Sequence, residues 1–182
     1  MKWYHDEPKL ALGSSNLTRA VKFSIIIVLK ISSNMLKIYD KTEDFTTYVE
    51  YEEIARQLDN IHVLYVRIPT DENIIEQIKY DYDVPYNDTI VLDSSTKNYQ
   101  SLREQFKKEH YHTDYEMRLF THGTAKFFFN VSDTVYELDV GPNDLISVPA
   151  NVKHWFDAGE YPNIKAVRFF TEKDGWEAIY TG

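Results

Sequence analysis

Two histidines and a glutamate are spaced in this sequence like ligands for a metal ion. They are His110, His112 and Glu116, in the stretch EHYHTDYEMR. If this stretch is one β-strand, its even-numbered side chains project from one face, because side chains alternate along a strand. That face would present two imidazoles and a carboxylate. The spacing therefore predicts a metal centre.

A third histidine, His154, lies in the stretch PANVKHWFD, which a neighbouring strand could bring opposite the first three residues. Three imidazoles and one carboxylate suit Fe(II), Ni(II), Mn(II) or Co(II). An octahedral ion would keep two positions free, which suits a substrate that chelates through two oxygens, such as an enediol. The alternatives are a closed zinc site, although structural zinc sites are mostly Cys-rich and this chain has no Cys, or histidines that merely pack in the core.

The elements that must position these residues change character near Glu109. Beyond it, β-branched and aromatic runs separated by turn signals predict five strands, at residues 117–120, 125–131, 135–140, 145–148 and 164–170. Gly123 falls where a hairpin would turn. Five strands at such close spacing favour a sandwich or barrel.

Before Glu109 the pattern predicts short helices at residues 51–59, 72–80 and 101–108, and a strand at residues 62–68 that Pro69 ends. Residues 9–35 have the weakest pattern. We therefore expect residues 1–35 to be an extension or insertion, and residues 36–182 to form a single domain with the metal site in residues 109–157.

The composition excludes several classes of function. With 20 Lys plus Arg against 29 Asp plus Glu, the net charge is −9, which argues against nucleic acid as a partner. The absence of Cys rules out thiolate chemistry. The most apolar run, Phe23 to Ile31, is far shorter than the roughly 20 residues that a membrane helix needs, and no signal peptide is visible. We expect a monomer in the cytoplasm, shared with the nucleus in a eukaryote, without nucleic-acid or membrane partners.

The sequence also resembles a known family. The pattern His110-x-His112-x3-Glu116-x6-Gly123, followed by Pro149-x-Asn151-x2-His154, resembles the two cupin motifs. Over residues 109–182 the segments EHYHTDYEMRLFTHG, NDLISVPANVKHWFD and AVRFFTEKDGWEAIYTG resemble, in order, the acireductone dioxygenases of the methionine salvage pathway. The resemblance implies a mainly β fold, the cupin double-stranded β-helix or jelly-roll barrel, with a few short N-terminal helices.

The resemblance also implies an activity. One Fe(II) or Ni(II) ion per monomer would be held by His110, His112, Glu116 and His154. The substrates would be 1,2-dihydroxy-3-keto-5-methylthiopentene and O2. With iron the family's products are formate and 4-methylthio-2-oxobutanoate, and with nickel they are formate, carbon monoxide and 3-methylthiopropanoate.

Three charged residues acquire expected roles from the resemblance. Arg118 would stabilise the substrate dianion, and its even number places it on the face of the ligands. Glu109 would serve metal incorporation while pointing away from the metal, and Arg168 would be a second positive group over the pocket. The alternatives are a surface salt bridge for Arg118, a solvated carboxylate for Glu109 and a strand-edge arginine for Arg168.

Further residues are less specific. Aromatic candidates for walling the substrate's thioether tail are Trp155, Phe156, Phe169, Phe170 and Trp176, while His5, His62 and His122 are expected at the surface. Two positions depart from the family pattern. Tyr115 stands where many members have Asp, and Asn151 replaces a glycine, although Asn tolerates left-handed backbone angles.

Two other functions fit the same motifs. One is a cupin dioxygenase of another substrate class, such as a flavonol or a diketone. The other is a non-catalytic cupin that stores or senses a ligand.

Overall fold

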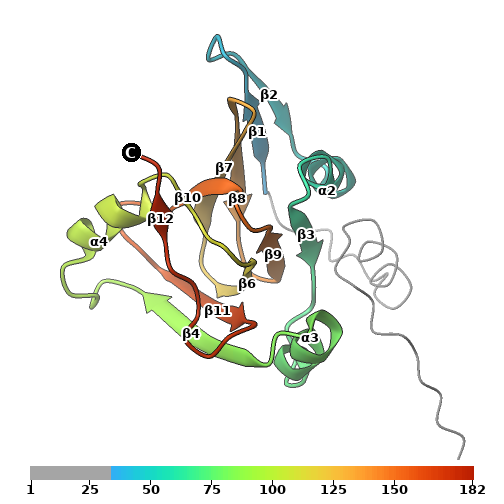
Figure 1. Ribbon diagram of the computed structural model, residues 1–182, viewed down its shortest axis with the longest axis vertical. Coiled ribbons are helices and arrows are strands. Elements are labelled where there is room, and N and C mark those ends of the chain that lie inside the picture. Colours follow the sequence, from blue (N-terminus) through green and yellow to red (C-terminus); the bar gives the residue numbers. More distant parts are fainter. Residues whose placement is uncertain (1–33) are drawn as a thin grey trace, which may run out of the picture.

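The computed structural model describes residues 34–182. The expected surface position of His5, and all but the last two residues of the expected extension at 1–35, lie outside the described residues. Two antiparallel sheets make up the body of the protein (Figure 1). The seven-stranded sheet has the order β12-β5-β10-β7-β8-β1-β2, and the five-stranded sheet has the order β3-β9-β6-β11-β4.

The five strands predicted beyond Glu109 are confirmed. They are β6 (Glu116–His122), β7 (Ala125–Val131), β8 (Thr134–Val140), β9 (Asp144–Val148) and β11 (Ile164–Phe170). The strand predicted before Pro69 is β3 (Leu64–Arg67), and His154 lies on β10 (Lys153–Asp157). Together with the two packed sheets, these strands confirm the mainly β, double-stranded β-helix prediction.

Four strands have no counterpart among the predicted elements. They are β1 (Leu36–Tyr39), β2 (Phe45–Tyr48), β4 (Tyr86–Leu92) and β12 (Ile179–Tyr180). β4 is an edge strand that pairs only with β11, and most of its side chains are exposed. An edge strand of this kind carries no alternation of apolar and polar residues, so periodicity does not reveal it.

The three predicted helices are present, with ends shifted by up to two residues. They are α2 (Tyr51–Asp59), α3 (Ile74–Tyr82) and α4 (Tyr99–Phe106). Asp83, which follows α3, adopts a left-handed conformation that ends the helix. Within residues 34–182, no helix combines the length and apolar character needed to cross a membrane.

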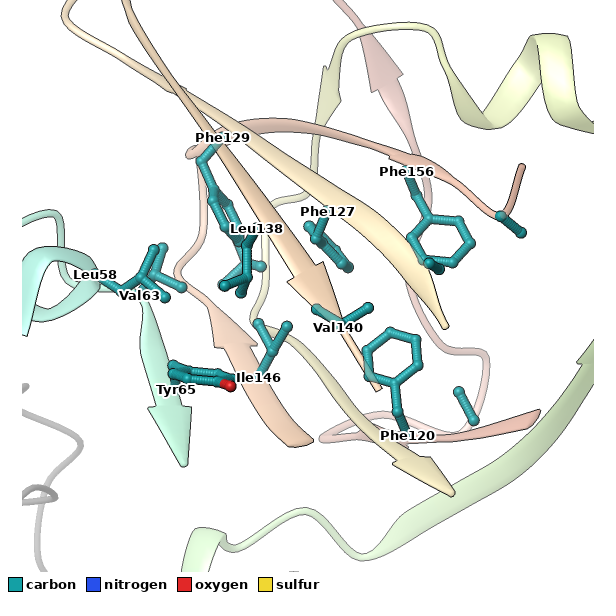
Figure 2. Close-up of a cluster of buried hydrophobic side chains, with 14 of the residues drawn as sticks. Leu58, Val63, Tyr65, Phe120, Phe127, Phe129, Leu138, Val140, Ile146 and Phe156 are labelled. Atoms are coloured by element: carbon teal, nitrogen blue, oxygen red, sulfur yellow. The ribbon is translucent and has the colours of Figure 1, made fainter. Parts of the chain in front are cut away.

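The main hydrophobic core lies between the two sheets (Figure 2). Phe127 and Phe129 of β7 point inward and are almost completely buried. Phe120 of β6 and Ile146 of β9 are buried to the same extent. A second apolar cluster packs α3 against other residues of β6, β9 and β11. Strand β6 is therefore covered on both faces, which makes it a rigid support for any site at its start.

Two turn residues adopt left-handed backbone angles, as their place in the motifs predicts. Gly123, at the end of β6, has φ +71°, and a Cβ there would lie 1.5 Å from the Asn163 carbonyl oxygen. Only glycine fits this approach. Asn151 has φ +66°, so the turn survives the replacement of glycine by Asn.

Candidate metal centre

Four side chains converge at one end of the space between the two sheets. One ligand atom from each of His110, His112, Glu116 and His154 lies within 4.8 Å of the others. All but His110 are buried. The stretch that supplies the first three is not one strand, however. His110 belongs to β5 (His110–Tyr111) in the seven-stranded sheet, and Glu116 begins β6 in the five-stranded sheet.

The single-strand interpretation of EHYHTDYEMR is therefore wrong, although the residues that it selected do converge. The chain leaves β5 at Tyr111 and crosses to the other sheet before Glu116. His112 lies in this crossing, where its backbone carbonyl accepts a hydrogen bond from Asn151. The side chains meet because the two sheets face each other, and strand alternation alone does not bring them together.

The seven-stranded sheet sets the position of two imidazoles directly. His110 and His154 are cross-strand partners on β5 and β10, and their ring centroids lie 4.6 Å apart. Phe127 on β7 packs against His154 at 5.8 Å. The site is thus anchored in the packed interior of the barrel.

Backbone carbonyls orient all three imidazoles. The Nδ1 atoms of His110, His112 and His154 lie 2.8, 2.6 and 2.8 Å from the carbonyl oxygens of Lys108, Glu177 and Val152. A carbonyl can only accept, so each Nδ1–H donates and each Nε2 is left for another partner. The Nε2 atoms of His112 and His154 lie 2.9 and 2.8 Å from Glu116 Oε2. This is how metal-binding histidines are commonly fixed.

Two groups of the cluster are held in the charge state that a metal ion requires. Burial acts to raise the pKa of the Glu116 carboxyl, but the Arg118 charge and the contacts with His154 and His112 hold that pKa well below its usual value. Burial lowers the pKa of His110, whereas burial of His112 is outweighed by its contact with Glu116, which raises the pKa of His112. Metal ligands must be an ionised carboxylate and neutral imidazoles, so a bound metal ion would displace the proton that His112 shares with Glu116.

Arg118 lies on the ligand face of β6, as its even number predicts. Its Nε is 2.5 Å from Glu116 Oε1, and its guanidinium carbon lies 5.5 to 5.9 Å from the ring centroids of Phe156, Trp176 and Phe127. The three aromatic rings attract the guanidinium charge and hold it beside the Glu116 carboxylate.

Glu109 and Arg168 do not touch the four ligands. Glu109 points away, as its odd number predicts, and its carboxylate accepts hydrogen bonds from Thr181 and Asn130 at 2.6 and 2.7 Å. It also pairs with Lys153 at 3.3 Å. Arg168 pairs with Asp88 on β4, so its charge is already engaged.

The aromatic candidates separate into three groups. Trp176 lies 5.7 Å from His112, and Phe170 lies 4.6 Å from Trp176. Phe156 and Phe169 are buried in the two cores. Trp155 stacks on Phe128, which alternates with the inward-pointing Phe127 and Phe129 on β7, so it belongs to the outer face of the sheet.

Sequence reasoning missed three contributors to the site. Phe127 could have been found from the alternation along β7. Asp88 and Glu177 could not, because their contacts depend on pairing between distant segments. The two other histidines within residues 34–182 agree with expectation, since His62 and His122 are exposed.

Comparison with known proteins places this site in a family. The model of the ARD/ARD' family matches residues 16–178. The chain belongs to the ARD/ARD' family. The ARD/ARD' match spans the four converging residues and the Arg118 position.

Relatives in the ARD/ARD' family share a name. An acireductone dioxygenase of Aquifex aeolicus is 38% identical over 164 residues, covering 81% of this chain and 90% of the relative. One from Granulibacter bethesdensis is 50% identical over 95 residues, covering 52% and 53%. The solved structure of the acireductone dioxygenase from Bacillus anthracis, with a cadmium ion in its active centre, matches with a TM-score of 0.71 and 27% identity, over 82% of this chain and 99% of that one.

Proposed function

We propose that this ARD/ARD' protein is a metal-dependent acireductone dioxygenase of the methionine salvage pathway. The observation that carries the proposal is the convergence of three imidazoles and one carboxylate within 4.8 Å, with an arginine in contact with that carboxylate. The similar relatives that bear the same name support it.

The proposed ligands are His110, His112, Glu116 and His154, for one Fe(II) or Ni(II) ion per monomer. The donor set fits such an ion, because each imidazole has its Nδ1–H engaged and its Nε2 directed to the centre. When bound, the ion would supply positive charge and a template for two substrate oxygens.

The chain's own groups favour a doubly deprotonated enediol. The Arg118 guanidinium carries a positive charge, which lowers the free energy of a dianion beside it. The rings around it, Phe127, Phe156 and Trp176, exclude water and thereby strengthen this interaction. Trp176 and Phe170 offer an apolar surface for the thioether tail.

Glu109 and Arg168 are proposed to act indirectly. Glu109 contacts side chains from three parts of the seven-stranded sheet. They are Asn130 of β7, Lys153 of β10 and Thr181, which directly follows β12. We propose that it serves metal incorporation by holding these strands around His110 and His154.

The function is tested by anaerobic reconstitution of the metal-free protein with Fe(II) and, separately, with Ni(II). Acireductone and O2 are then added, and products are detected by mass spectrometry and a carbon monoxide assay. We expect formate with either metal, 4-methylthio-2-oxobutanoate with iron, and carbon monoxide with 3-methylthiopropanoate only with nickel.

Other outcomes would point to the alternatives. Stoichiometric metal without turnover of acireductone would leave a cupin dioxygenase of another substrate class, to be tested with a flavonol and a diketone. Failure to bind either metal would leave a ligand-binding module.

We also propose that residues 36–182 act as a single cupin domain, and that the protein works as a cytoplasmic monomer, shared with the nucleus in a eukaryote, without nucleic-acid or membrane partners. The net charge of −9 supports the absence of nucleic acid. Size-exclusion chromatography with light scattering tests the monomer, for which we expect a mass near 21.5 kDa.

A further inference from the structure

Three charged side chains lie in a row across the edge of the five-stranded sheet. Asp88 on β4 is the register partner of Arg168 on β11, and Arg168 is the register partner of Arg118 on β6. Directly opposite residues in antiparallel strands point to the same face, with Cβ atoms about 4.5 to 5.5 Å apart. Arg168 therefore stands beside Arg118 on the face of the metal centre, where the two positive charges repel each other.

Each arginine has a carboxylate of its own. Arg118 contacts Glu116. Arg168 forms a bidentate ion pair with Asp88, because its Nε donates to Oδ1 at 2.8 Å and its Nη2 donates to Oδ2. These two hydrogen bonds fix the orientation of the guanidinium plane. The negative charge of Asp88 also offsets the repulsion between Arg168 and Arg118.

Both guanidiniums pack on the same indole. The Cζ atoms of Arg118 and Arg168 each lie 5.6 Å from the Trp176 ring centroid. Arg168 also lies 5.1 Å from the Phe170 ring, which packs against Trp176 at 4.6 Å. Arg168 thus helps to fix the position of Trp176.

Trp176 connects this arrangement to a proposed metal ligand. Its ring lies 5.7 Å from the ring of His112. The next residue along the chain, Glu177, provides the carbonyl that accepts the His112 Nδ1–H hydrogen bond at 2.6 Å. A displaced indole would move this carbonyl and with it the orientation of the His112 ring.

We propose that Asp88 is a positioning residue that acts through Arg168 and Trp176 to hold His112 in its ligand orientation. The inference rests on the metal centre proposed above. The side chains of Asp88 and Arg168 are 47% and 28% exposed, and an ion pair this exposed adds little to folding stability. Its effect is therefore expected in the geometry of the site, with the melting temperature nearly unchanged.

The test compares Asp88→Asn, Arg168→Gln and the double variant by two measurements. The first is the indole ¹H–¹⁵N spectrum of the metal-free full chain, which has three tryptophans, with Trp176→Phe used to assign the Trp176 signal. The second is the Ni(II) dissociation constant. We expect Asp88→Asn to shift the Trp176 signal and to weaken Ni(II) binding about 3- to 10-fold, less than the roughly 10- to 100-fold typical of direct partners of ligands.

The double variant and two controls make the test specific. If Asp88 acts through Arg168, the double variant is no weaker in Ni(II) binding than Arg168→Gln alone, and Asp88→Glu restores most of the affinity. Glu53→Gln removes the carboxylate of the Glu53–Arg56 pair on α2 and should change neither measurement.

An unchanged Trp176 signal and Ni(II) affinity in Asp88→Asn would overturn the proposal, as would additive effects in the double variant. A wild-type chain that binds no Ni(II) would instead overturn the proposed function. The indole signals of the metal-free variants would then still decide the role of Asp88.

Discussion

The three imidazoles of the proposed metal centre are each oriented by a different backbone carbonyl, so none of them depends on another of the three for its Nδ1–H hydrogen bond. Removing one should leave the other two in place. We expect His112→Ala or His154→Ala to lose most of the bound metal while keeping a folded barrel, as checked by metal analysis and circular dichroism. The matched controls His62→Ala and His122→Ala change exposed histidines and should retain metal. Full metal content in either ligand variant would contradict the assignment.

Arg118 contacts the carboxylate of the site but offers no lone pair to a cation. Arg118→Ala should therefore keep bound metal and lose turnover, with kcat/KM lower by about 100- to 1000-fold, the range for removing a preorganised charge donor. Steady-state kinetics on metal-loaded enzyme check this. Arg118→Lys keeps the positive charge without the planar guanidinium, so its kcat/KM should lie between those of the wild type and Arg118→Ala. Normal activity in Arg118→Ala would show that the dianion needs no help from this residue.

The sequence was most informative about individual residues, although it gave the wrong reason for their convergence. The spacing of His110, His112 and Glu116 selected residues that do converge, because chemistry restricts which side chains can meet at such a site. The reason given for their convergence was wrong, since His110 and Glu116 lie in different sheets. Spacing along the chain shows which residues have the right chemistry, but it does not reveal where the chain crosses from one sheet to the other.

Among the elements, the hairpin between β6 and β7 depends on a single residue. A Cβ on Gly123 would overlap the Asn163 carbonyl oxygen, 1.5 Å away. We expect Gly123→Ala to lower the free energy of unfolding by about 3 kcal/mol or more, from left-handed strain and a forced backbone shift. Gly159 has a similar φ of +81° and open space around it, so Gly159→Ala should cost only about 1 kcal/mol. Urea denaturation compares them, and equal losses would show that the close approach is unimportant.

An ion pair links helix α4 to β10. Arg103 donates from Nε and Nη2 to the two oxygens of Asp157, at 2.7 and 2.9 Å. These hydrogen bonds lower the pKa of the Asp157 carboxyl. The pair's contribution is therefore complete above the ordinary pKa of 3.8 and is lost as the pH falls through the lowered value.

Asp157→Asn should accordingly lower the free energy of unfolding by about 1 to 2 kcal/mol at pH 7. The difference from the wild type should begin to shrink below the ordinary pKa of 3.8, because the carboxyl of the unfolded chain then binds a proton before that of the folded chain. Urea titrations at pH 7 and pH 3 measure both values. A difference that persists unchanged at pH 3 would show that the loss has another cause than the ion pair.

The elements also show where prediction from the sequence stops. The strands of the two-sheet core were found because they are runs of mostly β-branched, aromatic and other apolar residues between turn signals. Burial alternates along β7 and is continuous along β9. β4 was missed because Asn87, Asp88 and Thr89 are exposed. Its place at the sheet edge is set by the register with β11, and no local pattern encodes that register.

For the molecule as a whole, the proposed ion would join the two sheets, since His110 and His154 belong to one and Glu116 to the other. An ion that binds only the folded state stabilises it by mass action. We expect Ni(II) at about 100 times its dissociation constant to add about 2.7 kcal/mol, seen as a higher melting temperature that chelation reverses. His112→Ala should show no such shift, and a shift in that variant would place the ion elsewhere.

The pairing of distant strands also bears on how fast the protein becomes competent to bind metal. Tyr65 on β3 and Asp144 on β9 are hydrogen-bonded across 79 residues of sequence, and Asp88 and Arg168 across 80. Proteins that depend on contacts between residues distant in sequence fold slowly, because long loops must lose conformational entropy before these contacts can form. The two sheets must come together before the four ligands can meet, so metal uptake by a refolding chain should lag behind helix formation.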